Sequence, residues 1–175
     1  MPLSKKPYRS EYGDFYAEYV NELPDHSLLQ ILPYQNRQFL DLLSDFSDQS
    51  SQRRYEPGKW SVKEVLGHLA DTELIFQYRA LSLARGEQKP LPGYDHDHYV
   101  LNANFDDMPL NQLLERIRLT REITISLFHS FNDVQLMRSG VVNDNPFTVR
   151  AIGFVIAGHE FHHMKMIRQK YLPLM

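Results

Sequence analysis

The chain has 175 residues, a formal net charge of −3 and no cysteine. Its length fits a single domain over residues 1–175, with residues 1–24 as an N-terminal extension. The lack of cysteine excludes disulfides, thiolate metal sites, iron–sulfur clusters and a cysteine nucleophile.

The charge pattern and hydropathy exclude two further classes of protein. The basic residues are dispersed, without the stripe typical of nucleic-acid binding. No apolar run approaches the roughly 20 residues that span a bilayer, and the N-terminus has no apolar signal segment. We therefore expect a cytoplasmic protein that binds neither nucleic acid nor membranes.

Apolar residues recur at helical spacing in four segments, at about 27–46, 61–86, 109–131 and 148–170. Ser61 and Glu64 form a capping box at the start of the second helix, and Thr148 caps the last. Residues 87–107 and 142–146 are expected to form loops. No segment shows the sustained alternation of apolar and polar residues that is typical of a strand. The pattern predicts an all-α four-helix bundle about 30–36 Å long.

The last predicted helix contains the segment HEFHH, His159 to His163. With about 100° of rotation per residue, His163 falls near the centre of the apolar stripe and His159 close beside it. His162 is rotated toward the edge. Two imidazoles at i and i+4 lie close enough on one helix face to share a metal ion.

His68, at the border of the stripe of the second helix, is the third candidate ligand. Three histidines with a fourth position left to water are typical of a catalytic metal site. The alternative is that these side chains are core or interface histidines. For His159 and His163 together this alternative weakens, because one metal satisfies two adjacent buried imidazoles.

The remaining histidines point less clearly to a site. His26 and His129 lie near helix ends, and His96 and His98 fit a polar loop better than a metal site. HEFHH also matches the H-E-x-x-H pattern of zinc proteases. Those enzymes take a third ligand downstream, where this chain has no His, Asp or Glu.

Three segments, YEPGKWSVKEVLGHLADTE, LPGYDHDHYV and IAGHEFHHMKMI, resemble the DinB/YfiT-like superfamily. This resemblance implies a four-helix bundle with down-up-up-down connectivity, often a homodimer. It also implies a divalent metal, zinc or nickel, held by His68, His159 and His163. Some members resemble thiol S-transferases, and others carry only a hydrolase label.

Three hypotheses for function follow. The first is a thiol S-transferase, in which the metal favours the thiolate of a low-molecular-weight thiol that attacks a small electrophilic substrate. The second is a metal-dependent hydrolase that uses metal-bound hydroxide. The third is a non-enzymatic dimeric bundle that binds metal or a small ligand.

Candidates for supporting roles are less specific. A hydrolase needs a general base, and four carboxylates are candidates: Asp71, Glu73, Asp97 and Glu160. For Asp71, one turn from His68, the first expectation is a hydrogen bond to a ligating imidazole. Glu160 is expected either to support a ligand in the same way or to lie on the surface. Tyr94, Asp97, His98 and Arg150 could line the mouth of the site, although turn and surface roles are favoured for each. Trp60 is expected to anchor packing.

Overall fold

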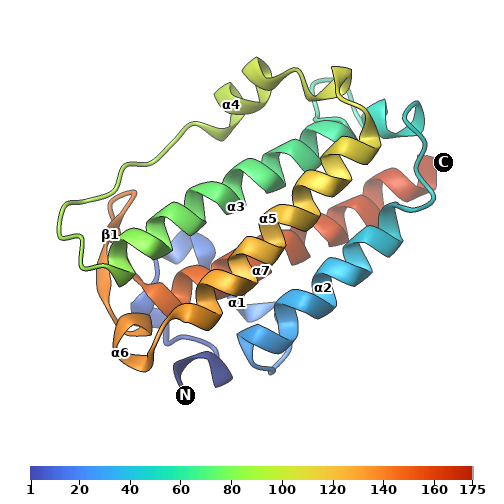
Figure 1. The fold of residues 1–175 in the computed structure, drawn as a ribbon. Helices are drawn as coiled ribbons and strands as arrows, with labels where there is room; N and C mark the ends of the chain where they lie inside the picture. The colour runs from blue at the N-terminus through green and yellow to red at the C-terminus, as the bar shows by residue number, and fades with distance from the viewer. Residues whose placement is uncertain (175) are drawn as a thin grey trace.

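The structure, a computed structural model, describes residues 1–174. Its four long helices form the predicted bundle: α2 (Leu28–Leu43), α3 (Val62–Ala84), α5 (Leu110–Ser130) and α7 (Val149–Met166) (Figure 1). A π-helical segment, Ile167–Tyr171, extends α7. Among these residues no helix combines the length and apolarity that crossing a membrane requires.

The helix starts follow the predicted caps. Ser61 Oγ accepts from the backbone N–H of Glu64, and Glu64 accepts from the N–H of Ser61 at 2.7 Å. Thr148 Oγ1 likewise accepts from the N–H of Ala151 at the start of α7. Each cap satisfies backbone donors that the first turn leaves free.

Helices α3 and α5 run in the same direction, because residues 85–109 return along the length of the bundle (Figure 1). Near their starts, Lys63 Nζ donates to the carbonyl of Met108 at 2.8 Å. Beyond their ends, Arg138 donates to the carbonyl of Ala84. Helices α2 and α7 run the opposite way, so the connectivity is down-up-up-down.

Two predicted loops contain regular structure. The 87–107 segment holds helix α4 (His96–Ala103) and a 3-10 turn at Phe105–Asp107. Residues 139–148 form an antiparallel hairpin of β1 (Ser139–Val142) and β2 (Asn145–Thr148), so the expectation of no strands is wrong. Asn143 and Asp144 turn the hairpin with φ of 48° and 59°, a conformation that Asn and Asp tolerate. Strands of four residues are too short for alternation to be recognised.

Residues 1–24 pack against the bundle through α1 (Ala17–Asn21) and three 3-10 turns, Pro2–Ser4, Arg9–Glu11 and Asp14–Tyr16. A Cβ at Gly158 of α7 would lie 2.3 Å from the carbonyl oxygen of Tyr19. Glycine therefore permits the N-terminal segment to approach α7 at this point. The remaining short elements are α6 (Asp133–Leu136) and 3-10 turns at Ser50–Gln52 and Leu172–Leu174.

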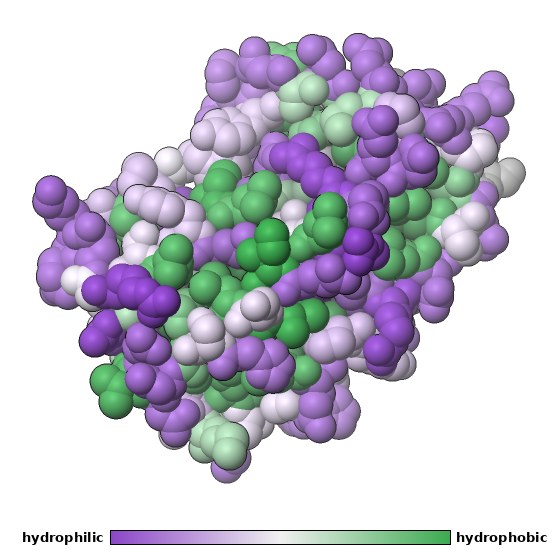
Figure 2. All heavy atoms as spheres, viewed as in Figure 1, coloured by the Kyte–Doolittle hydropathy of each residue, from purple (hydrophilic) through white to green (hydrophobic). Residues whose placement is uncertain are grey.

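The core consists of two apolar clusters, and the middle of each long helix between them is polar and buried. This middle layer contains Gln35 of α2, Thr72 and Glu73 of α3, Arg121 and Thr124 of α5, and Glu160 and His163 of α7, beside the half-buried His159. On the outside, apolar side chains gather over α5 among polar ones (Figure 2), where α5 exposes Leu119 and Ile123. The candidate site lies in the polar layer.

Candidate metal centre

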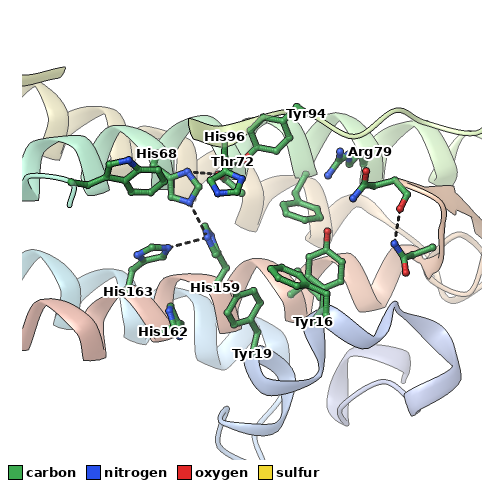
Figure 3. Close-up of a pocket in the computed structure, with 16 residues that line it drawn as sticks. Tyr16, Tyr19, His68, Thr72, Arg79, Tyr94, His96, His159, His162 and His163 are labelled. Atoms are coloured by element: carbon green, nitrogen blue, oxygen red, sulfur yellow. Dashed lines mark hydrogen bonds between the residues drawn. The ribbon is translucent and has the colours of Figure 1, made fainter. Parts of the chain in front are cut away.

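The structure brings the three predicted histidines together from two helices (Figure 3). The Nε2 atom of His159 lies 3.1 Å from Nε2 of His68 and 3.1 Å from Nε2 of His163. His162 is not a member of this group, although its ring lies 5.3 Å from those of Tyr19 and His163 between centroids and it lines the same pocket. The grouping of His159 with His163 agrees with the helical phase, which set these two inward and His162 at the edge.

Hydrogen bonds alone cannot satisfy this arrangement of imidazoles. A neutral imidazole nitrogen carries either one proton or one lone pair, so Nε2 of His159 can serve only one of its two neighbours. In a tetrahedral zinc site with Zn–N bonds of roughly 2.0–2.1 Å, neighbouring nitrogens are separated by about 3.3 Å. The spacing of the three Nε2 atoms therefore fits a single small divalent ion.

The local electrostatics keep these imidazoles neutral. Burial, reinforced by the nearby His96, lowers the pKa of His68 to about 4. Burial and the neighbouring histidines also hold the pKa values of His159 and His163 well below the usual range. Neutral imidazole is the form that binds metals, so the ligand form is available at neutral pH.

The outward nitrogen of His68 faces a short hydrogen-bond chain. Thr72 Oγ1 lies 3.3 Å from His68 Nδ1 and 2.6 Å from the hydroxyl of Tyr94. Thr72 therefore takes the position next to His68 that was expected for Asp71, which instead pairs with Arg116 of α5 at 2.5 Å. Nδ1 of His163 is buried and has no partner within residues 1–174.

Glu73 and Glu160, two of the candidate general bases, form ion pairs with a buried arginine. Arg121 of α5 forms a bidentate pair with Glu73, at 2.8 and 2.9 Å, and reaches Glu160 at 2.6 Å. Thr124 Oγ1 also donates to Glu73 at 2.5 Å. Glu160 is thus a buried partner of Arg121, and its surface alternative is wrong. A buried guanidinium needs such carboxylates to offset its desolvation.

The three histidines lie at one end of a pocket of about 440 Å³ (Figure 3). Helix α3 contributes Thr72, Phe76 and Arg79, and the N-terminal segment contributes Phe15, Tyr16 and Tyr19. Tyr94, His96, Trp60 and the hairpin residues Asn143 and Asn145 complete most of the wall. Among residues 1–174, no Asp or Glu lines this pocket.

Of the four residues that were predicted to line the mouth of the site, one lines the pocket. Tyr94 lines the pocket, whereas Asp97 and His98 do not. Arg150 is buried against Glu11, to which it donates at 2.7 Å, so the surface alternative for Arg150 is also wrong. His96, discounted in the sequence, lies in the pocket wall with its ring 5.6 Å from that of His68.

Some of the pocket residues could be predicted from the sequence, and others could not. Thr72, Phe76 and Arg79 follow His68 by 4, 8 and 11 positions, which places them on the same face of α3. Trp60 packs on His68 at 4.8 Å between ring centroids, so it is both a packing residue and part of the wall. Tyr16 and Tyr19 belong to a segment without long helical periodicity, which gave no signal.

Comparison with known proteins supports the fold and identifies the family. YfiT from Bacillus subtilis, described as a probable metal-dependent hydrolase with an unusual four-helix bundle topology, superposes with a TM-score of 0.72. It is 18% identical, and the match covers 99% of this chain and 98% of that one. A protein of Oceanobacillus iheyensis named "Putative metal-dependent hydrolase" is 26% identical over 143 residues, 81% of each chain.

The sequence pattern of the DinB superfamily matches residues 32–167, which include both helices of the three-histidine group and the whole segment between them. The match spans more than three quarters of the chain. The chain therefore belongs to the DinB superfamily.

Proposed function

We propose that this protein is an enzyme that depends on a divalent metal, zinc or nickel, held by His68, His159 and His163. The observation that carries the proposal is the grouping of three neutral imidazoles, whose possible ligand atoms all lie within 4.8 Å of one another, at the end of a pocket. Three protein ligands leave a coordination position open, as catalytic sites require. The ion would supply Lewis acidity that activates a small nucleophile.

Thiol S-transfer is the reaction we favour. The sulfur of an external thiol attacks carbon, a carbon–sulfur bond forms, and the carbon–halogen bond of the electrophile breaks. The halide leaves with the bonding electrons, and the thiol proton passes to solvent or to His96 at the pocket wall. This chemistry needs no carboxylate base, in agreement with a pocket that no Asp or Glu of residues 1–174 lines.

Hydrolysis is the second candidate, and the descriptions of the two related proteins favour it. In this reaction the chain's own contribution would be His96, which reaches the pocket near His68 and can accept a proton. The aromatic walls would bind the apolar part of the substrate and exclude bulk water. The two reactions differ in whether an added thiol is consumed.

The test begins with untagged protein, whose metal content is measured by plasma mass spectrometry beside the His159→Ala, His163→Ala double variant. Both proteins, after incubation with zinc or nickel, then receive 1-chloro-2,4-dinitrobenzene with cysteine or other small thiols, and separately 4-nitrophenyl acetate without thiol. We expect about one ion per chain and thiol loss that matches chloride release. The double variant should bind no ion and should show only the uncatalysed rate of thiol loss.

The matched control is His129→Ala, because His129 is exposed at the end of α5 and does not line the pocket. It should keep both metal and activity. Ester cleavage without thiol consumption would replace S-transfer by hydrolysis. Bound metal without either reaction would support the non-enzymatic binding protein, and absence of metal from all variants would refute the proposed site.

A further inference from the structure

Arg79 is a buried cation at the far end of the pocket from the three histidines (Figure 3). Arg79 is only 3% exposed to solvent. A guanidinium has five N–H donors, and the structure gives Arg79 one acceptor, the carbonyl of Pro92 at 2.8 Å from Nη2. Most of its donors are therefore not used by the residues described.

The other buried arginines show what this position lacks. Arg121 pairs with Glu73 and Glu160, and Arg150 pairs with Glu11. Within residues 1–174, no carboxylate lies within 4.0 Å of the Arg79 guanidinium. A buried charge without a counterion is costly, and charged groups in protein interiors are normally paired.

The free donors of Arg79 are accessible from the pocket. The side chain of Arg79 is part of the pocket wall. The guanidinium nitrogens that have no hydrogen-bond partner are not fully enclosed by protein. The guanidinium carbon lies 5.0 Å from the ring centre of Phe76 and 5.8 Å from that of Tyr94. These rings hold the guanidinium in place without neutralising it.

We propose that Arg79 binds the carboxylate of an elongated substrate whose reacting group lies at the three-histidine site. This inference rests on the proposed function, because it assigns the substrate class of the same pocket. One guanidinium matches a monoanion in charge and a carboxylate in planar geometry. A phosphate dianion would need more positive charge than Arg79 supplies.

The geometry of α3 sets the shape of this substrate. His68, Thr72, Phe76 and Arg79 line the pocket in that order along one face of the helix. At a rise of 1.5 Å per residue, the Cα atoms of His68 and Arg79 are about 16 Å apart along the axis. Between them the wall is aromatic, with Phe76 and Tyr16 in edge contact at 6.1 Å. The middle of the substrate should be apolar or aromatic.

The experiment measures binding to the full-length, metal-free protein by isothermal titration calorimetry. The probes are 6-phenylhexanoate and 6-phenylhexanamide, which differ in charge but hardly in shape. We expect the carboxylate to bind about tenfold more tightly than the amide, as a charge-assisted bidentate pair does. Arg79→Gln should abolish this preference, and Arg79→Lys should retain part of it.

Arg85→Gln is the matched control, since Arg85 caps the C-terminal end of the same helix and does not line the pocket. It should leave the preference unchanged. Failure of the carboxylate to bind up to 10 mM, equal binding of both probes, or a preference that survives Arg79→Gln would overturn the proposal. Tighter binding of 5-phenylpentyl phosphate would overturn the assignment to a carboxylate.

The same titrations with the His159→Ala, His163→Ala variant separate this inference from the proposed function. The carboxylate preference should persist there, because Arg79 lies at the other end of the pocket. Loss of metal with a persistent preference would be the expected result. Normal metal binding without any carboxylate preference would reject the role of Arg79 and leave the metal site standing.

Discussion

At the scale of single residues, the hydroxyl of Thr72 decides how His68 is presented. If His68 binds a metal through Nε2, its Nδ1 carries a proton and donates to Thr72 Oγ1. The hydroxyls of Thr72 and Tyr94 share a second hydrogen bond of 2.6 Å, in which either oxygen can donate. The bond from Nδ1 to Thr72 fixes both the tautomer and the ring orientation of His68.

We predict that Thr72→Val weakens zinc binding about 10- to 100-fold, because valine keeps the shape of threonine and removes the acceptor. Competition with a chromophoric chelator measures the affinity. Tyr94→Phe is the matched variant, which leaves the Thr72 oxygen in place and should have a smaller effect. Equal zinc affinity in Thr72→Val and wild type would show that Thr72 does not orient His68.

Helical phase predicted the inward residues of α7 well, but it could not identify the partners of buried charges. His159 and His163 follow from a 100° rotation applied to a clear apolar stripe. Arg79, Glu73 and Arg121 are charged residues that a sequence reading places on the surface by default. Their burial depends on which helix lies opposite, which is a property of the tertiary structure.

At the scale of elements, Arg121 joins the four long helices in the polar layer of the core. It extends from α5 to Glu73 of α3 and Glu160 of α7, and its Nη1 lies 3.5 Å from the carbonyl of Leu32 in α2. Glu160 is next to His159 in α7, so the contact with Arg121 also fixes the part of α7 that carries the site. This arrangement ties the bundle geometry to the three histidines.

Arg121→Met should lower the free energy of unfolding by about 3–5 kcal/mol, because it leaves two buried carboxylates without their cation. Urea unfolding followed by circular dichroism measures the change. Adding Glu73→Gln and Glu160→Gln to Arg121→Met removes the stranded charges and should restore a large part of the loss. If the single variant were as stable as wild type, the ion pairs of Arg121 with Glu73 and Glu160 would contribute nothing to stability.

The sequence predicted elements in proportion to their length. Four helices with long apolar stripes were recognisable, and the capping signals at Ser61 and Thr148 located two of their starts. The hairpin escaped because its strands are only four residues long and its turn, Asn143-Asp144, reads equally well as a loop. The homodimer and the cytoplasmic location stay predictions.

At the scale of the whole molecule, the N-terminal segment completes the pocket that the bundle begins. Tyr16 and Tyr19 form part of its wall, with Tyr19 against the ring of His159 at 5.6 Å. The segment is held by Glu11, which accepts hydrogen bonds from Arg150 and Thr148, each at 2.7 Å. Residues before the first long helix are therefore part of the candidate site, although they carry none of the predicted ligands.

We predict that Glu11→Gln loosens this segment and lowers the free energy of unfolding by about 3 kcal/mol at neutral pH, because Arg150 loses its counterion. Burial raises the pKa of Glu11, but hydrogen bonds from Arg150, Thr148 and the backbone of Tyr8 outweigh it, so the net pKa is lowered. A carboxylate with a lowered folded-state pKa stabilises the fold above its unfolded value, here 4.5. That stability is lost as the pH falls through the folded-state pKa.

The difference in unfolding free energy between wild type and Glu11→Gln should therefore be largest above about pH 5 and shrink as the pH falls below 4.5. Urea titrations at several pH values measure this difference, and limited proteolysis should cleave residues 1–24 faster in the variant. Glu18→Gln, at an exposed position in the same segment, is the control and should behave as wild type. A difference that stays constant from pH 3 to pH 7 would mean that the Glu11 charge does not hold the segment against the bundle.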